Sequence, residues 1–331
     1  MDATPITART ADPMVEFWRG ERVESRHAGH AAICDATGTM VAAWGDPEAV
    51  IYPRSSCKML QALPLVESGA AAGVGDDLLA LACASHNGAG IHTRPVARWL
   101  ADIGCGEGDL LCGAHMPKDA VAAEALIRAR RAPGPIHNNC SGKHAGFLTL
   151  TRHLRAGPDY IDVDHPVQRA VRAAFEELTG AESPGWGIDG CSAPNFVTTV
   201  AGLARAMARF AAADPEGGAR DRAMARLTRA MTRHPDLVAG EGRACTGLMR
   251  AMGGRVAVKT GAEGVFVAIL PELRLGVALK IADGAGRAAE VAIAALLARL
   301  GVLDPVGWTS PVAHNWRGVV TGRLAPAPGF P

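Results

Sequence analysis

Residues 52–64 read YPRSSCKMLQALP and mark the point at which the chain changes from strand to helix. Upstream, residues 14–52 alternate apolar and polar side chains, which predicts antiparallel strands with short connections. Downstream, Met59, Leu60 and Leu63 recur at helical spacing, which predicts a helix over 57–67. The junction between the two patterns carries a cluster of polar residues, so we expect chemistry there as well as a change of structure.

Helical patterns fill the middle of the chain, and strand patterns return towards its C-terminal end. We expect further helices at 76–84, 93–102, 119–130, 142–154, 165–179, 196–212, 220–233, 243–251 and 286–300, and further strands at 255–259, 264–270 and 274–281. Asp164 is a candidate cap for the helix at 165–179. The proline-rich tail from Ala325 is expected to be coil.

This order of elements lacks the strand–helix alternation of a parallel sheet. It predicts an α+β fold, in which both ends of the chain build one antiparallel sheet and a helical subdomain is inserted between them. The sheet subdomain would comprise about 12–55 and 252–310, and the helical subdomain about 56–251.

Composition excludes several function classes. With 34 Lys and Arg against 33 Asp and Glu, the net charge of +1 does not suit a general nucleic-acid binder. We expect no membrane span, because the most apolar stretch, 265–281, contains Pro271, Glu272, Arg274 and Lys280. The first residues lack the apolar core of a secretory signal, so we expect a cytoplasmic protein whose eight cysteines are reduced.

The first chemical motif is Ser55-x-x-Lys58. On a helix, residues three apart share a face. Burial and the positive end of a helix both disfavour an ammonium ion, so a lysine placed there can accept the proton of a serine nucleophile. The alternative is a serine that caps the helix and a lysine that is exposed in its first turn.

Two further motifs favour the catalytic interpretation. Ser85-His86-Asn87 forms S-x-N in an expected turn between helices, and Lys259-Thr260-Gly261 forms K-T-G on an expected edge strand. In this order, S-x-x-K, S-x-N and K-T-G are the signature of serine β-lactamases and penicillin-binding proteins. The chemistry that they indicate is acyl transfer through a serine nucleophile.

A second group of residues lies outside that signature. It comprises NNCSGKHAG at 138–146 and DGCSAP at 189–194. Cys140 and His144 lie four residues apart on one helix face, and Cys191 is a third soft ligand from another loop. Three protein ligands with an open position are typical of a zinc site. Two buried thiols beside a capping cluster are the alternative.

Taken together, five strings resemble the rhizobial-type, class-three (thermolabile) L-asparaginases of the asparaginase II family. They are YPRSSCK-x-x-QALP, ASHNG, NNCSGKHAGFL, DGCSAPNF and VKTGAEGVF. The resemblance runs from about residue 14 to residue 300. The family often has proline directly after the lysine of the first motif, where this chain has Met59. We expect that difference to alter local packing and not chemistry.

The resemblance implies a fold related to serine β-lactamases and glutaminases, a homodimer, and hydrolysis of L-asparagine to L-aspartate and ammonia. It also implies two serine–lysine pairs. Ser55 matches the nucleophile, with Lys58 as its base. Ser85 and Lys259 match a supporting pair that relays protons or positions water.

The resemblance also implies a zinc ion near the substrate, held by two cysteines and one lysine. The matching residues are Cys140, Lys143 and Cys191, so Lys143 replaces the His144 that spacing had suggested. We expect His144 and Asp189 in the second shell, where they would orient ligands or bound water. The zinc is expected to organise the substrate pocket.

The substrate is expected to meet four further residues. Arg54 suits its α-carboxylate, because a guanidinium binds a carboxylate with two hydrogen bonds. The motif positions Asn87, Thr260 and Gly261 are the other three.

Three other functions stay open at this point. A glutaminase would use the same nucleophile, and one methylene in a pocket is worth only about 1–3 kcal/mol. A β-lactamase-like hydrolase would be acylated by a β-lactam. A zinc-binding or ligand-binding relative without catalysis would keep the ligands but not turnover.

Overall fold

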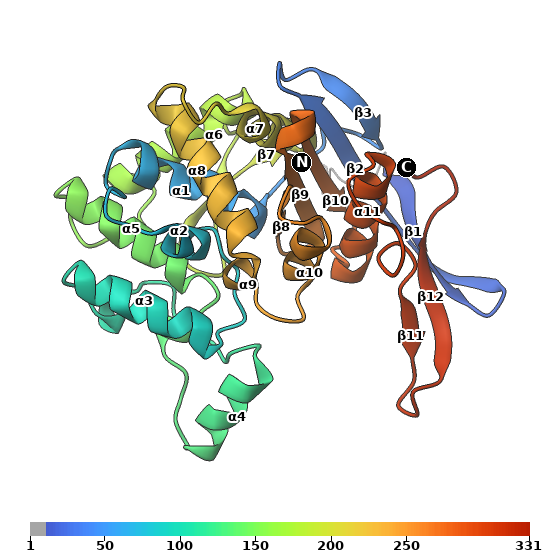
Figure 1. The fold of residues 1–331 in the computed structure, drawn as a ribbon, viewed down its shortest axis with the longest axis horizontal. Coiled ribbons are helices and arrows are strands. Elements are labelled where there is room, and N and C mark those ends of the chain that lie inside the picture. Colours follow the sequence, from blue (N-terminus) through green and yellow to red (C-terminus); the bar gives the residue numbers. More distant parts are fainter. Residues whose placement is uncertain (1–10) are drawn as a thin grey trace, which may run out of the picture. The chain divides into compact units, whose positions relative to one another are not determined.

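The computed structural model describes residues 11–331 and is drawn in Figure 1. Residues 1–10, which belong to the segment expected to lack the apolar core of a secretory signal, lie outside the described residues. The chain forms two compact units. The sheet unit contains the described residues up to Ser56, Val197–Ala212 and Ala251–Pro331, and the helical unit contains Cys57–Phe196 and Ala213–Arg250.

The sheet unit is built on an eight-stranded antiparallel sheet in the order β11-β12-β1-β2-β10-β9-β8, with β3 paired to β2. Its strands are β1 (Asp12–Arg19), β2 (Arg22–Asp35), β3 (Met40–Trp44), β8 (Ala257–Thr260), β9 (Val265–Leu270), β10 (Leu275–Ile281), β11 (Val312–His314) and β12 (Val320–Pro326). The short strands β4 (Val50–Ile51) and β7 (Thr198–Thr199) form a separate pair. The expected antiparallel sheet from both ends of the chain is confirmed.

Two helices cover the centre of this sheet. All six residues of β9 are buried, and successive strand side chains point to opposite faces, so both faces of β9 are covered. The helices that pack on β9 are α7 (Val200–Ala212) and α11 (Gly286–Arg299). On β10, the backbone of α7 comes so close to Gly276 that a Cβ there would lie 2.0 Å from the amide nitrogen of Ala208.

Two sequence-based expectations were wrong in this unit. Residues 197–212 were expected in the helical subdomain, but α7 packs on β2, β9 and β10 and belongs to the sheet unit. The tail was expected to be frayed or packed as coil from Ala325, but β12 continues to Pro326 and pairs with β1, with Val15 opposite Pro326. The expectation was wrong for Ala325 and Pro326 alone, because residues 327–331 form no helix or strand. The pairing partner is some 300 residues away, and a local composition argument could not reveal it.

The helical unit is arranged around α1. Residues 58–65 of this helix are all buried, and α1 packs against α2, α5, α6 and α8. The helices of the unit are α1 (Lys58–Glu67), α2 (Asp76–Ala82), α3 (Gly90–Asp102), α4 (Ala120–Arg128), α5 (Ser141–His153), α6 (Pro166–Thr179), α8 (Ala219–Arg233), α9 (Pro235–Val238) and α10 (Ala244–Ala251). The strands β5 (Trp186–Ile188) and β6 (Pro194–Phe196) form a hairpin in the same unit.

Helix α6 begins with a different cap from the one expected. His165, and not Asp164, is the N-cap: its Nδ1 accepts a hydrogen bond of 3.2 Å from the amide of Val167, and Pro166 is the first helical residue. Pro166 has no N–H to satisfy and favours the first turn, so the cap lies directly before it. None of the helices within residues 11–331 combines the length and the apolar character needed to cross a bilayer.

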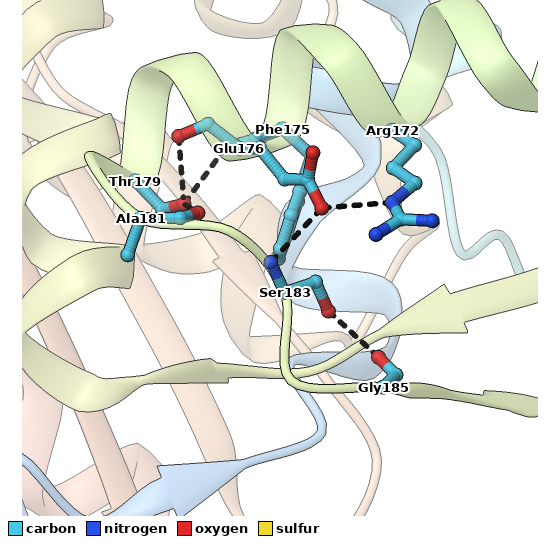
Figure 2. Close-up of polar contacts among 7 residues, drawn as sticks. All are labelled: Arg172, Phe175, Glu176, Thr179, Ala181, Ser183 and Gly185. Carbon is cyan, nitrogen blue, oxygen red and sulfur yellow. Dashed lines mark hydrogen bonds and ion pairs between the residues drawn. The ribbon is translucent and has the colours of Figure 1, made fainter.

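Figure 2 shows how the other end of α6 leads into the β5–β6 hairpin. The carboxylate of Glu176 accepts a hydrogen bond of 2.8 Å from Nε of Arg172 and one of 2.9 Å from the amide of Ser183. The hydroxyl of Ser183 in turn donates to the carbonyl of Gly185 at 2.6 Å. These contacts fix the entry to the hairpin against the helix.

Candidate active site

Lys58 lies at the start of α1 and is almost completely buried. Its Nζ is 3.0 Å from Oγ of Ser85 and 3.0 Å from Sγ of Cys140, and it also donates to the carbonyl oxygen of Ala84. A buried charge needs such partners, because its removal from water costs several kcal/mol. The structure therefore brings together one residue from each of three segments that the sequence had singled out.

Ser85 is held in the turn between α2 and α3 by its neighbours. Its own amide donates to the carbonyl of Val238 at 2.9 Å, and the amide of the next residue, His86, donates to the carbonyl of Asn139 at 3.2 Å. The side chain of Asn87 accepts from the amide of Ala89 at 3.3 Å and is buried. Asn87, which was expected to bind substrate, thus stabilises the turn in which it lies.

The loop of the β5–β6 hairpin presents Asp189 and Cys191. The amide of Asp189 donates to the carbonyl of Ala193, and the amide of Ser192 donates back to the carbonyl of Asp189. Ser192 adopts φ = 69°, an uncommon conformation for a residue with a side chain, which closes the loop tightly. As a result, the Sγ of Cys191 lies 3.3 Å from Oδ2 of Asp189 and 2.9 Å from Nζ of Lys143.

The ligand atoms of Cys140, Asp189 and Cys191 all lie within 4.8 Å of one another. Lys143 lies in the first turn of α5, two residues after Ser141, and its Nζ contacts Cys191 of the same cluster. Two thiols and a carboxylate so close together are a donor set that suits Zn²⁺. The expected ligand residues therefore do meet in space, although they come from two separate segments.

The cluster is electrostatically coupled. A hydrogen bond with Cys191, helped by the charges of Lys58 and Lys143, holds the pKa of Cys140 well below its usual range in spite of burial. The same contact and burial raise the pKa of Cys191 to about 11. Burial alone would lower the pKa of Lys143, but the charges of Cys191, Cys140 and Asp189 outweigh it and raise the pKa.

The buried imidazole of His144 contacts Tyr160. Its Nδ1 is 2.9 Å from the hydroxyl of Tyr160, and burial lowers the pKa of the imidazole to about 4, partly opposed by Cys191. Among residues 11–331, Nε2 of His144 has no hydrogen-bond partner although it is buried. An imidazole nitrogen left in this state is available to a water molecule or to a metal, so both Lys143 and His144 stay candidates for the third ligand.

The sheet unit carries the other expected catalytic residues. Half-buried Ser55 lies in a single 3₁₀ turn, Arg54–Cys57, that leads into α1, and Arg54 adopts φ = 52°. Lys259 lies on the edge strand β8, is 1% exposed, and donates from Nζ to the carbonyl of Thr260 at 2.8 Å.

The turn at Ser55 and the end of β8 are in contact through backbone atoms. A Cβ at Gly261 would lie 2.6 Å from the carbonyl oxygen of Pro53 and 3.2 Å from the amide nitrogen of Ser56. That carbonyl oxygen accepts both the amide and the hydroxyl of Ser56, the latter at 2.7 Å. The role of Gly261 in this structure is therefore close packing behind the expected nucleophile.

Sequence reasoning did not identify several residues of the site. The motifs pair Ser55 with Lys58 and Ser85 with Lys259, but they did not predict that Lys58 contacts Ser85 and Cys140. Tyr160 and His86 were also missed. The structure adds one feature: Lys58, Lys143 and Lys259, three of the five lysines in the sequence, are all buried, which is rare for this residue type.

Comparison with known proteins identifies one family. The model of the family described as L-asparaginase II matches residues 15–326. No curated protein matches the chain.

Among solved structures, the chain resembles Mglu in its Tris and glutamate form, with 17% identity and a TM-score of 0.47 over 83% of this chain and 59% of that one. It also resembles a β-lactamase from Mycobacterium bovis, with 15% identity and a TM-score of 0.42 over 79% of this chain and 89% of that one. The chain thus spans about three fifths of the length of the Mglu chain. TM-scores of this size establish neither a shared fold nor a shared activity.

Proposed function

Because the chain belongs to the L-asparaginase II family, we propose that this amidohydrolase converts L-asparagine to L-aspartate and ammonia through a serine acyl-enzyme. The family membership indicates hydrolysis of an amide. The single structural observation that supports the serine–lysine chemistry is the contact of 3.0 Å between Nζ of the buried Lys58 and Oγ of Ser85. The rhizobial, class-three subgroup is part of the same proposal.

In the proposed reaction, Oγ of Ser55 attacks the side-chain amide carbon of L-asparagine, and its proton passes to Lys58, which acts as base in its uncharged form. The C–N bond then breaks, and the nitrogen takes that proton from Lys58 and leaves as ammonia. Water adds to the β-aspartyl ester and gives a proton to Lys58; the bond between the acyl carbon and Oγ of Ser55 then breaks, Oγ takes this second proton, and L-aspartate is released. Ser85 and Lys259 are assigned to proton relay, since Ser85 contacts Lys58 directly.

Substrate recognition is assigned to the polar residues around the two motifs. Arg54 would bind the α-carboxylate with two hydrogen bonds. Asn87, Thr260 and Gly261 would orient the rest of the amino acid. Thr260 is the last residue of the edge strand β8, and Gly261 follows it directly.

The zinc site is proposed on the same cluster of sulfur ligands. Cys140 and Cys191 would bind the ion, Lys143 would supply an amine after losing its proton, and Asp189 and His144 would act from the second shell. The low pKa of Cys140 and the buried, unpartnered Nε2 of His144 fit a metal at this position. When bound, zinc would organise the substrate pocket by fixing the start of α5 and the hairpin loop to each other.

The resemblance of the five sequence strings to the family supports two further proposals: a fold related to serine β-lactamases and glutaminases, and a homodimer.

The substrate is tested by ammonia release from L-asparagine and from L-glutamine in the same buffer, with hydrolysis of the β-lactam nitrocefin run beside them. Strong release from asparagine with little from glutamine is the expected result. Preferential release from glutamine would make the chain a glutaminase. Turnover of nitrocefin alone would replace the proposal by a β-lactamase-like activity.

A further inference from the structure

His86 is a completely buried residue that the proposed reaction does not use. It occupies the middle position of the Ser85-His86-Asn87 motif. Its ring stacks on that of His92, with centroids 4.8 Å apart and planes 8° apart. Burial and the neighbouring His92 lower the pKa of His86 well below its usual value, so the ring is neutral at pH 7.

The hydrogen bonds of His86 define its tautomer. The amide of Gly88 donates to Nδ1 at 3.2 Å, so this nitrogen carries the lone pair. The proton of a neutral ring must then be on Nε2, which lies 3.0 Å from Oγ of Ser141 and donates to it. Nδ1 thus binds a backbone amide of the turn that contains His86, and Nε2 binds the first residue of α5.

His86 reaches both residues that flank Cys140. Its backbone amide donates to the carbonyl of Asn139 at 3.2 Å, while its side chain donates to Ser141. Cys140 and Ser85 are the two residues whose side chains contact Nζ of Lys58 at 3.0 Å. Ser85 is the residue directly before His86, so any shift of His86 would move both contacts of the buried lysine.

We propose that His86 is a positioning residue, which clamps the turn of Ser85 to the start of α5 and so fixes Ser85 and Cys140 against Lys58. The consequence for turnover rests on the proposed function. The clamp itself does not, because it is a statement about two hydrogen bonds and can be measured in a protein of any activity.

Two variants remove the side-chain bond from opposite ends. His86→Phe keeps an aromatic ring for the stack on His92 but has no nitrogen, and Ser141→Ala leaves His86 intact and removes only the hydroxyl. In each, amide hydrogen exchange in the segment containing Ser85 and His86 should become at least about tenfold faster. Because displacement of a reacting group by 1 Å can cost about 100-fold, kcat for L-asparagine should fall by about 10- to 100-fold, with KM nearly unchanged.

The chain offers a closely matched control in His165. This buried histidine of the same unit also accepts a backbone amide at 3.2 Å through Nδ1 and has an oxygen 3.0 Å from Nε2, here the carbonyl of Gly157. His165→Phe therefore removes the same chemistry from α6. It should lower the melting temperature without changing exchange at Ser85 or kcat.

The double variant His86→Phe, Ser141→Ala separates a clamp from two independent defects. If His86 acts through Ser141, the double variant loses no more in kcat than the worse single variant, because each single variant already breaks the hydrogen bond between His86 and Ser141. The variant His86→Gln, whose amide can still donate towards Ser141, should recover part of the lost rate.

Unchanged exchange at Ser85 in both single variants would overturn the proposal whatever the enzyme does. Faster exchange with the wild-type kcat would overturn the role of the clamp in the reaction. If the wild-type protein releases no ammonia from asparagine, the proposed function fails by itself, and the exchange comparison alone then supports or contradicts the clamp.

Discussion

At the scale of single residues, the site is unusual in burying two lysines beside two cysteines. Lys58 and Lys143 are 1% and 3% exposed, and each has a sulfur atom within 3.0 Å of its Nζ. Removing one member of a buried pair leaves an uncompensated charge, which typically costs about 3–5 kcal/mol. We therefore expect the two lysines and the sulfur atoms beside them to depend on each other for stability.

Removal of the amine of Lys58 tests its assignment as the base. Lys58→Met should lower kcat by about 10²- to 10⁴-fold, because a positioned general base contributes that much to proton transfer. The exposed Lys118 provides the control, and Lys118→Met should retain the wild-type rate. Ammonia release under saturating asparagine measures both. A Lys58→Met variant with more than a third of the wild-type kcat would remove Lys58 from the role of base.

The zinc proposal makes a separate prediction at this scale. Cys191→Ser should weaken zinc binding by at least about 100-fold, measured by competition with a chromophoric chelator, because a soft thiolate ligand is lost. Cys112→Ser is the matched control: this thiol is also buried, burial raises its pKa to about 12, and it is not one of the three clustered metal-binding groups. Equal affinity in the two variants would remove Cys191 from the metal site.

Candidate site residues can be identified from the sequence where a motif contains them. Ser55, Lys58, Ser85 and Lys259 stand out because their triplets occur together and in order. The contact between Lys58 and Cys140 was not predictable, because it joins positions 82 residues apart that no spacing rule connects.

At the scale of elements, α5 is the part of the helical unit that carries the proposed metal site. Its first turn holds Ser141 and Lys143 and follows Cys140 directly. A Cβ on Gly142 would lie 2.3 Å from the carbonyl oxygen of Leu81, so the start of α5 rests on the end of α2 through a position that only glycine can occupy. The close approach of these two helices sets where Cys140 and Lys143 stand.

A methyl group at this contact should disturb both stability and the metal site. Gly142→Ala should lower the free energy of unfolding by about 1–3 kcal/mol, since the clashing atom is backbone and cannot turn aside. Gly157→Ala is the control, because a Cβ there meets nothing within 4 Å. Denaturant unfolding of the two variants measures the difference. A Gly142→Ala variant as stable as Gly157→Ala would contradict the packing described for α5.

Long periodic elements were predictable, and short ones were not. The helices expected at 142–154, 220–233 and 286–300 agree with α5, α8 and α11 within about one residue at each end. Strands β5, β6 and β11 have three residues each, too few for alternation to be visible. The β5–β6 hairpin nevertheless presents Asp189 and Cys191, and tertiary contacts such as those of Glu176 in Figure 2 hold it in place.

At the scale of the whole molecule, the order of patterns along the chain predicted the antiparallel sheet and the inserted helices. It did not predict that the chain returns to the sheet unit at Val197–Ala212 before the helical unit is complete. Helix α7 has the same kind of apolar stripe as the helices around it, and the sequence does not say which surface that stripe covers. Which surface an amphipathic helix packs against depends on the other elements of the assembled core.

Acid should destabilise the folded protein. Burial lowers the pKa of both His86 and His92, so below about pH 6.5 the unfolded chain binds more protons than the folded one. The free energy of unfolding is therefore highest above pH 6.5 and falls as the pH drops towards the folded-state pKa values, by up to about 1.4 kcal/mol per pH unit for each group.

Denaturant unfolding between pH 7.5 and 5 with a chelator present measures this slope. The slope should become smaller in His92→Phe and should stay the same in His153→Gln, which changes an exposed histidine. A wild-type stability that does not change over this range would contradict the neutral, buried state of the pair.

We propose Ser55 as the nucleophile of an asparagine amidohydrolase. Ammonia release from L-asparagine by the wild-type protein, Ser55→Ala and Ser56→Ala tests it most directly, because the two serines are adjacent and only Ser56 is engaged with the carbonyl of Pro53 through its hydroxyl at 2.7 Å. We predict that Ser55→Ala loses at least about 10³-fold in kcat, whereas Ser56→Ala stays within about tenfold of the wild-type protein. Equal rates in the two variants, or retention of turnover by Ser55→Ala, would contradict the claim.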